Sequence, residues 1–264
     1  MSFRRQTEML VAERHRKIVD VVNEKLSVRV TELSKLFKVT EETIRRDLEK
    51  LEKENLLRRS HGGAVSIQDE QTEVSYTERE ITNAAEKRAI ALEAVKLIQP
   101  GDQIVLDAST TAWYMAKEMP DVPLTVLTNS IKVAVELSKK EQVRVISTGG
   151  MLQPKSLSYV GPLAERSLNM YHVNKAFISC KGVHIEAGLS DSNEWQALLK
   201  RQMMSISDQT ILMADSTKFG VRTFAQITEI QKISYVITDS LIKESYISGL
   251  EEKGVQFNTV MVNG

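Results

Sequence analysis

The sequence predicts an α/β protein with two domains: an N-terminal winged helix-turn-helix domain and a C-terminal domain built on a parallel sheet. Three observations indicate this: two short amphipathic helices separated by three residues, strand and helix patterns that alternate after residue 100, and opposite net charges in the two parts. A chain of 264 residues is long enough for each domain to bury its own core. We expect the first domain at residues 1–65, a polar linker at 66–80 that leaves room for a short amphipathic piece, and the second domain at 81–264.

The N-terminal domain is expected to begin with a helix over residues 13–25, whose apolar residues share one face. A short alternating run at 27–30 is typical of an edge strand. Near the end of this domain, residues 56–65 form a basic, extended run that includes the pair Gly62-Gly63, as in a hairpin turn. A third helix and a basic hairpin around two paired helices indicate a winged helix-turn-helix.

The helix pair is the feature around which this domain is organised. Its first helix is expected over residues 30–37 and its second within residues 39–51. Thr40 is a suitable N-cap, because its hydroxyl can accept a backbone N–H of the first turn. From Ile44 onward, apolar residues recur at i, i+4 and i+7 and form one buried stripe. In helix-turn-helix proteins the second helix enters the major groove of DNA by its N-terminal part.

The face opposite this stripe carries cations. Arg45 and Arg46 lie near the N-terminus of the second helix, where cations oppose the helix dipole unless an anion such as DNA phosphate compensates. A plainer interpretation is that the two helices only pack together and that their arginines are solvated. For DNA we expect Thr43 and Arg46 to contact bases. The other DNA-binding candidates are expected to contact phosphates, to cap the helix or to lie in the wing. They are Lys35, Thr40, Arg45, Arg58, Arg59 and His61.

The charge distribution favours a polyanionic partner for the N-terminal part alone. Residues 1–64 contain 15 Lys and Arg against 11 Asp and Glu, giving +4, whereas residues 65–264 contain 20 against 24, giving −4. Together with the helix pair, this predicts double-stranded DNA as the partner.

No stretch approaches about 18 consecutive apolar residues, and no signal-peptide pattern is seen, so we expect a cytoplasmic protein without a membrane partner. Cys180 is expected to be a buried core residue, and we expect no metal and no cofactor.

The C-terminal domain is expected to open with a helix over residues 83–99, which ends at Pro100-Gly101. Compact β-rich runs then alternate with helices, and this indicates a parallel sheet that is covered on both faces. The expected strands are 103–106, 124–127, 143–146, 175–180, 210–214, 232–238 and 255–262. Because such sheets bind ligands at the carboxyl ends of their strands, the loops at that edge are the expected site.

The loops after the first three strands are rich in hydroxyl groups or glycine. Residues 109–111 open a helix and combine hydroxyls with free backbone N–H groups, as a phosphate requires, although such a cluster is about as often only a helix cap. Asn129 can donate and accept, and the pair 149–150 allows close approach of the backbone. Lys218 could meet a phosphate, although a plain surface lysine is the alternative. The ligand-binding candidates are Asp107, Ser109, Thr110, Thr111, Asn129, Gly149, Gly150 and Lys218.

Two sets of motifs, taken in order along the chain, match one known family. The N-terminal set is the segment 13–64, with Thr-Ile-Arg-Arg-Asp-Leu at 43–48 and His-Gly-Gly-Ala at 61–64. The C-terminal set consists of 107–111, 128–130, 149–150, 160–162, 188–189, 215–220 and 238–239. Over nearly its whole length the chain resembles the DeoR family of bacterial regulators of sugar metabolism. The resemblance implies that the 43–48 helix reads DNA, that the sensor domain is similar in fold to ribose-5-phosphate isomerase, and that the effector is a phosphorylated sugar. Most members of the family are repressors, so we expect a repressor relieved by this effector; an activator with the same architecture is the alternative, which the sequence does not separate from it.

One departure from the family pattern and one aromatic pair bear on the identity of the sugar. The family usually has glycine where this chain has Ser109, so the loop has less backbone freedom and one more hydroxyl. Trp113 and Tyr114 lie one turn further on and could pack against a methyl group, although core filling is the commoner role of such residues. This favours a deoxy-sugar phosphate, such as rhamnulose or fuculose phosphate.

The rival hypothesis is a sugar-phosphate isomerase with a helical appendage. Isomerisation needs a positioned base, and the candidates are Asp107, Glu194, Asp215 and Lys218. A basic winged helix would have no purpose in such an enzyme, so we expect a regulator that is not an enzyme. We also expect a homo-oligomer, a dimer or a tetramer, because paired helix-turn-helix domains bind repeated half-sites.

Overall fold

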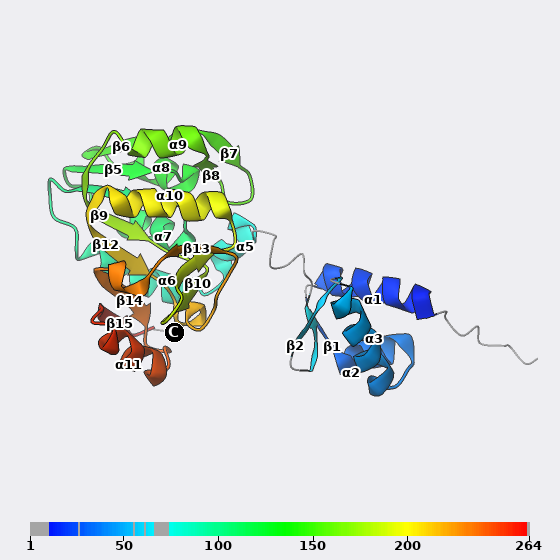
Figure 1. Cartoon of the computed structure of the whole chain (residues 1–264). Helices are drawn as coiled ribbons and strands as arrows, with labels where there is room; N and C mark the ends of the chain where they lie inside the picture. Colours follow the sequence, from blue (N-terminus) through cyan, green and yellow to red (C-terminus); the bar gives the residue numbers. More distant parts are fainter. Residues whose placement is uncertain (1–10, 26, 55, 61, 66–73, 263–264) are drawn as a thin grey trace, which may run out of the picture. The chain divides into compact units, whose positions relative to one another are not determined.

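The computed structural model describes residues 11–262 apart from residues 26, 55, 61 and 66–73 (Figure 1). The chain forms two compact units, Met1–Thr72 and Glu73–Gly264. Each unit buries a hydrophobic core of its own.

The N-terminal unit consists of three helices and a small antiparallel sheet with the strand order β1-β3-β2. Its elements are α1 (Val11–Lys25), β1 (Ser27–Arg29), α2 (Val30–Phe37), α3 (Glu41–Lys53), β2 (Arg58–Ser60) and β3 (Gly63–Val65). All three helices and the sheet contribute to one buried cluster of aliphatic residues. The predicted winged helix-turn-helix is confirmed, with three residues between α2 and α3.

Helix α3 begins and packs as its sequence predicts. The backbone N–H of Thr43 donates to Oγ1 of Thr40 at 3.2 Å, so Thr40 is the N-cap. Ile44, Leu48 and Leu51 are at most 1% exposed and face the core. The opposite face of α3 is therefore free.

Asp47 is buried on the inner side of α3, which the hydrophobic pattern did not predict. Its carboxylate accepts hydrogen bonds from Nε of Arg14 at 2.7 Å and pairs with Nε2 of His15 at 2.9 Å. Burial opposes ionisation, but these α1 partners prevail and lower the pKa of Asp47. The ion pair therefore fixes α3 against α1.

The wing depends on a glycine where two backbones meet. A Cβ atom on Gly63 would lie 2.2 Å from the carbonyl oxygen of Val28, in the neighbouring strand β1. Only glycine fits this approach. The strand pair β2-β3 is thus held close against β1 and the helices.

The C-terminal unit begins earlier than the sequence suggested. Within the expected linker 66–80, residues 66–73 lie outside the described part, but α5 (Tyr76–Ile81) is an ordered helix with Ser75 as its N-cap. Tyr76 is 2% exposed, and its backbone N–H donates to the carbonyl of Lys155 at 2.7 Å. The polar composition of this segment concealed a single buried aromatic that anchors it, so residues 74–80 belong to the C-terminal unit.

The C-terminal unit is a three-layer α/β structure. Its helices are α5, α6 (Ala84–Val95), α7 (Thr110–Glu118), α8 (Ile131–Leu137), α9 (Pro162–Leu168), α10 (Glu194–Ser205) and α11 (Glu244–Glu252), with the 3₁₀ turns η1 (Ser216–Lys218) and η2 (Ile230–Lys232). The strands of its main sheet are β4 (Gln103–Leu106), β5 (Leu124–Thr128), β6 (Val143–Ser147), β9 (Val173–Ile178), β12 (Ser207–Met213), β14 (Tyr235–Asp239) and β15 (Gln256–Val260).

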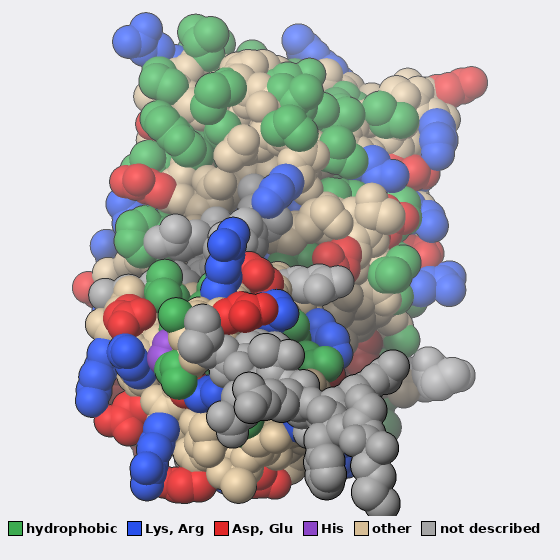
Figure 2. Space-filling view, turned by 90° about the vertical axis from the view of Figure 1, so that its right-hand side faces the viewer, with side chains coloured by type: hydrophobic (Ala, Val, Ile, Leu, Met, Phe, Trp, Pro, Cys, Tyr) green, Lys and Arg blue, Asp and Glu red, His purple; other side chains and the backbone are tan. Residues whose placement is uncertain are grey.

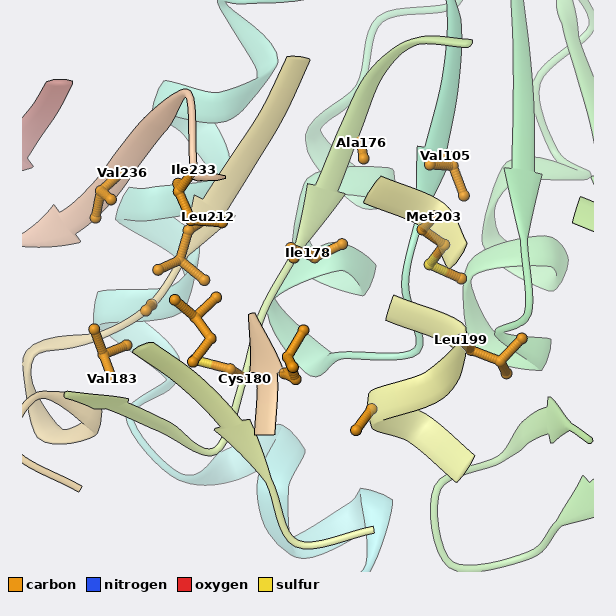
Figure 3. Packing of buried hydrophobic residues seen from close by; sticks show 14 of the residues in the cluster. Val105, Ala176, Ile178, Cys180, Val183, Leu199, Met203, Leu212, Ile233 and Val236 are labelled. Atoms are coloured by element: carbon orange, nitrogen blue, oxygen red, sulfur yellow. The ribbon is translucent and has the colours of Figure 1, made fainter. Parts of the chain in front are cut away.

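All strand pairs of this sheet are parallel, in the order β15-β14-β12-β9-β4-β5-β6. Helices α6, α7 and α8 pack on one face and α9, α10 and α11 on the other. Alternate residues of β4 point into the two hydrophobic cores. Ile104 and Leu106 face one core. Val105 faces the other, beside Leu199 and Met203 of α10 (Figure 3). The predicted parallel sheet with two covered faces is confirmed.

Two small antiparallel pieces lie outside the main sheet and were not predicted. They are the hairpin of β7 (Met151–Gln153) and β8 (Ser158–Val160), and the sheet of β10 (Gly182–His184), β11 (Gly188–Asp191) and β13 (Ala225–Thr228). Runs of three or four residues carry too little periodicity to be recognised. In the part of the chain that the structure describes, no helix is long and apolar enough to cross a membrane.

Candidate functional sites

The outer face of α3 presents its two arginines to solvent. Nε of Arg46 lies 3.3 Å from Oε1 of Glu42, and Nη2 of Arg45 lies 3.7 Å from Oε2 of Glu41. The Arg46 side chain is 78% exposed. Each arginine therefore has a glutamate partner on the same helix. From the sequence, DNA phosphate was the only anion suggested for them. Exposed pairs at i, i+4 contribute only about 0.5 kcal/mol or less, so a phosphate or a base can replace the glutamates.

The other DNA-binding candidates lie around α3. Lys35 is exposed on α2, and Arg59 is exposed in β2, where its backbone N–H donates to Oε1 of Glu52 at 2.8 Å. Arg58 also belongs to β2, and His61 lies outside the described residues. The hydroxyls of Thr40 and Thr43 are 2.9 Å apart, which places Thr43 at the exposed start of α3.

The C-terminal unit contains a cavity of about 250 Å³ over the carboxyl ends of β4, β9 and β12. From β4 the chain proceeds outward through β5 and β6, then returns to β9 on the other side of β4. The sheet therefore changes direction between β4 and β9, and ligands of open α/β sheets bind at such a switch point. Helix α5, the start of α6, α10 and η1 complete the walls.

Four of the eight ligand-binding candidates line this cavity: Ser109, Thr110, Thr111 and Lys218. Ser109 is the N-cap of α7, and its Oγ accepts from the backbone N–H of Ala112 at 3.0 Å. Thr110 and Thr111 are the first two residues of α7, where backbone N–H groups have no intrahelical acceptor. Capping and a phosphate cradle are therefore compatible at this loop.

Asp107 supports the cavity from below instead of lining it. It is 1% exposed, and its two carboxylate oxygens accept from the backbone N–H groups of Ser109 at 3.1 Å and Ser179 at 2.9 Å. This side chain therefore ties the loops after β4 and β9 together, in a structural role.

Asn129, Gly149 and Gly150 do not line the cavity, which corrects the expectation that three consecutive loops would meet there. The side-chain amide of Asn129 donates to the carbonyl of Tyr159 at 3.0 Å in β8. A Cβ atom on Gly150 would lie 2.8 Å from the carbonyl oxygen of Val160, so this glycine serves hairpin packing. The loops after β5 and β6 are thus used to hold the hairpin β7-β8.

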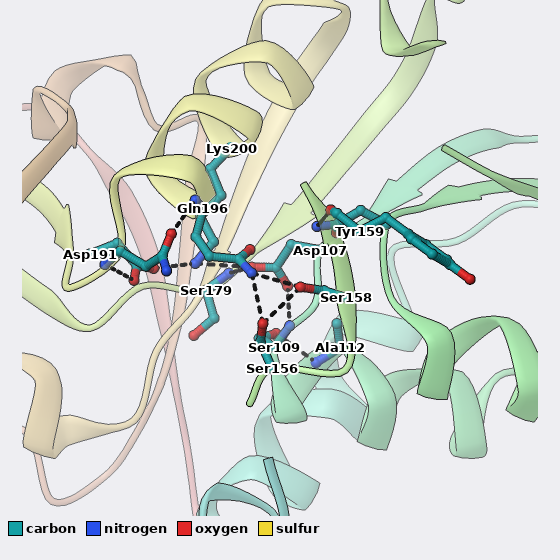
Figure 4. A network of polar contacts seen from close by, with 12 residues as sticks. Asp107, Ser109, Ala112, Ser156, Ser158, Tyr159, Ser179, Asp191, Gln196 and Lys200 are labelled. Atoms are coloured by element: carbon teal, nitrogen blue, oxygen red, sulfur yellow. Dashed lines mark hydrogen bonds and ion pairs between the residues drawn. The ribbon is translucent and has the colours of Figure 1, made fainter. Parts of the chain in front are cut away.

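The cavity contains a buried ion pair that sequence reasoning missed. Nζ of Lys200, on α10, lies 2.6 Å from Oδ2 of Asp191 and 3.6 Å from Oδ2 of Asp107 (Figure 4). Burial opposes the charge, but the two carboxylates prevail and raise the pKa of Lys200. One turn away, Gln196 donates to the hydroxyls of Ser156 and Ser158. A lysine in an amphipathic helix is normally expected to face solvent, so no pattern in the sequence indicated that Lys200 is buried.

The cavity walls carry more positive than negative charge. They include five cationic residues, Arg79, Lys87, Lys181, Lys200 and Lys218, against three acidic ones, Glu78, Asp191 and Asp215. Burial, together with the neighbouring Arg79 and Lys218, lowers the pKa of Lys181 to about 7. Burial likewise raises the pKa of the Cys180 thiol to about 12, so this cysteine is an inert core residue as predicted. The cavity is suited to an anion.

The aromatic pair that suggested a deoxy sugar lies elsewhere. Trp113 does not line the cavity but packs on the core beside Tyr114, with ring centroids 5.0 Å apart. Nζ of Lys117 lies 4.6 Å from the Trp113 ring centroid. Core filling, the commoner role, applies to both aromatics.

The carboxylates named for an isomerase are engaged or remote. Asp107 is held as described, and Asp215 caps η1 by accepting from the backbone N–H of Thr217 at 3.2 Å. Glu194 does not line the cavity.

A winged helix-turn-helix unit followed by an α/β unit with a cationic cavity is the organisation of a ligand-responsive transcriptional regulator. Residues 14–70 match the model of the DeoR-like helix-turn-helix domain, and residues 82–240 match that of the DeoR C-terminal sensor domain. The chain therefore belongs to the DeoR family.

Two relatives with similar sequences agree with this assignment. The HTH-type transcriptional regulator YulB of Bacillus subtilis (strain 168) is 63% identical over 96% of this chain and 98% of its own length. The L-fucose operon activator of Haemophilus influenzae is 39% identical over 86% of this chain and 92% of its own length. Among solved structures, ribose 5-phosphate isomerase A from Methanocaldococcus jannaschii has 16% identity and a TM-score of 0.40, covering 52% of this chain and 55% of its own.

Proposed function

We propose that the protein is a repressor of a carbohydrate catabolic operon, relieved when a phosphorylated sugar binds in the cavity of the C-terminal unit. The observation that carries this proposal is the excess of cationic residues around a cavity at the switch point of the sheet. Its volume of about 250 Å³ suits a small molecule. Effector binding must favour one arrangement of the protein over another, because a ligand with equal affinity for both shifts nothing.

The phosphate of the effector is assigned to the start of α7. The free backbone N–H groups of Thr110 and Thr111, their hydroxyls and the helix dipole all favour an oxyanion there. Lys218 adds a point charge from η1.

A deoxy-sugar phosphate, such as rhamnulose or fuculose phosphate, remains our proposal for the effector. Its methyl group would contact Val74, Ala108 and Cys180, which are the apolar residues of the cavity. The name of the Haemophilus relative, which concerns the 6-deoxy sugar L-fucose, supports the same class.

We also propose that the protein acts as a homo-oligomer, a dimer or a tetramer. Met151 and Leu152 of β7 and Leu163 of α9 are exposed. Figure 2 shows hydrophobic side chains gathered over the top of the C-terminal unit, where Figure 1 places β7 and α9. An apolar surface of this kind is typical of a protein interface, and a second copy would pair the DNA-binding units on repeated half-sites.

The test is a DNA-release assay with the full-length protein and its upstream operon region. We expect one 6-deoxyketose 1-phosphate to release the DNA, while the unphosphorylated sugar does not. The corresponding hydroxymethyl sugar phosphate should bind about tenfold more weakly. Equal affinity for both would exclude the deoxy sugar, and release by no sugar phosphate would contradict the proposed effector class.

Deletion of the gene tests repression separately. Deleting the gene should raise transcription of the operon, whereas an activator would give the opposite result.

A further inference from the structure

Arg79, on α5, has an unusual position in the cavity wall. Its Nε donates to the carbonyl of Val74 at 3.1 Å, and the Tyr76 ring centroid lies 5.6 Å from its guanidinium carbon. Its Nη2 is buried and has no hydrogen-bond partner among the described residues. A buried donor of a charged group is costly to leave unpaired, so this nitrogen is prepared for an acceptor that the protein itself does not provide.

The surroundings of Arg79 indicate that this acceptor is an anion. Arg79 and Lys218 are close enough to Lys181 to act on its charge, and all three line the cavity. None of them forms an ion pair within the described part of the chain. Positive charges on these side chains repel one another, and Asp191 offsets this repulsion only in part at Lys181. An anion between the three side chains would remove it.

Helix α5 is attached to the body of the C-terminal unit at both ends. Tyr76 is buried at its start, and Nζ of Lys87 donates to the carbonyls of Arg79 and Thr82 at its end. In the sequence, α5 follows residues 66–73, which connect the two units. A ligand held by Arg79 therefore acts on the first helix that follows the connection to the DNA-binding unit.

We propose that Arg79 is a direct ligand of the effector's phosphate, and that α5 is the element through which the C-terminal unit registers the bound effector. This inference rests on the proposed function and assigns its regulation to one residue. A guanidinium can donate two parallel hydrogen bonds to phosphate, which a lysine cannot.

The experiment compares Arg79→Gln, Arg79→Lys and the wild type as full-length proteins. Binding of inorganic phosphate is measured by calorimetry, and release from operator DNA is measured with the sugar phosphate that acts on the wild type. We expect about tenfold to hundredfold weaker binding for Arg79→Gln. Arg79→Lys keeps the charge but loses the bidentate geometry, so its loss should be smaller. Both variants should bind operator DNA normally without effector. Arg88→Gln is the matched control, because Arg88 is exposed, pairs with Glu118 and lies outside the cavity.

The inference about Arg79 and the proposed function would be overturned by different results. Wild-type affinity for phosphate and normal DNA release in both Arg79 variants would overturn the inference and leave the proposed function intact. A wild type that no sugar phosphate releases from DNA would instead overturn the proposed function. Thermal melting of each variant establishes that it is folded, and Arg79→Lys supplies the comparison if Arg79→Gln does not fold.

Discussion

At the residue scale, we expect the protonation of Lys181 to be coupled to anion binding in the cavity. Its amine has no described hydrogen-bond or ion-pair partner, and burial together with Arg79 and Lys218 holds its pKa at about 7. A bound anion stabilises the ammonium form and raises that pKa. Above pH 7, anion binding must therefore take up a proton, whereas below pH 7 the amine is already charged.

We therefore expect anion affinity to be greatest below about pH 7 and to fall as the pH rises toward about pH 8, with a limiting loss of about tenfold per pH unit. Sulfate is the appropriate probe, because it does not titrate in this range. The measurement is calorimetric titration of the full-length protein. In Lys181→Gln the part of the pH dependence centred near pH 7 should be lost and affinity should be low. Any slope that remains near pH 8 belongs to Lys87, which also lines the cavity and whose pKa burial lowers to about 8. An unchanged slope in this variant would assign the titration to another group.

At the element scale, we propose different roles for α3 and α2 in DNA binding. We expect Arg46 of α3 to contact bases in the groove and Lys35 of α2 to contact the phosphate backbone. Base contacts give sequence preference, and phosphate contacts give affinity that depends on salt.

Arg46→Ala should therefore remove operator preference, at a cost of about 1–3 kcal/mol on the operator duplex. Lys35→Ala should weaken binding to all duplexes about equally and reduce the salt slope by about one unit. Fluorescence anisotropy on operator and random duplexes over a salt series measures both effects. If the two variants behave alike, the assignment of these roles is wrong.

Periodicity predicted most elements at this scale, because an apolar stripe is a local property of the chain. It succeeded for α3 and for the strands of the main sheet. For α5 it left a short amphipathic piece open but did not predict that Tyr76 anchors this segment to the C-terminal unit. It also missed the inward-facing Asp47, whose partner Arg14 lies on another helix. Both failures concern contacts with residues distant in the sequence.

At the scale of the whole molecule, DNA binding and ligand sensing are assigned to separate units. The fragment of residues 1–72 contains a complete hydrophobic cluster and the whole α3 face. We expect it to fold, to protect DNA in a footprinting assay, and to show no response to sugar phosphates. Its affinity should be lower than that of the full-length protein, because the fragment lacks the proposed oligomer and its avidity. A fragment that is folded but binds no duplex of any composition would contradict this division.

Two units, a helix capped by Thr40 and the strand ends at which a ligand can bind were all predictable from the sequence, because each follows from residues that are neighbours in the chain. Which strand ends meet was not predictable in this way, because it depends on the order of the strands in the sheet. The sheet changes direction between β4 and β9, so the loops after β4, β9 and β12 form the cavity, while Asn129 and Gly150 serve the hairpin β7-β8. Strand order is a property of the folded chain, and it places Arg79 and Lys181, about a hundred residues apart, in one wall.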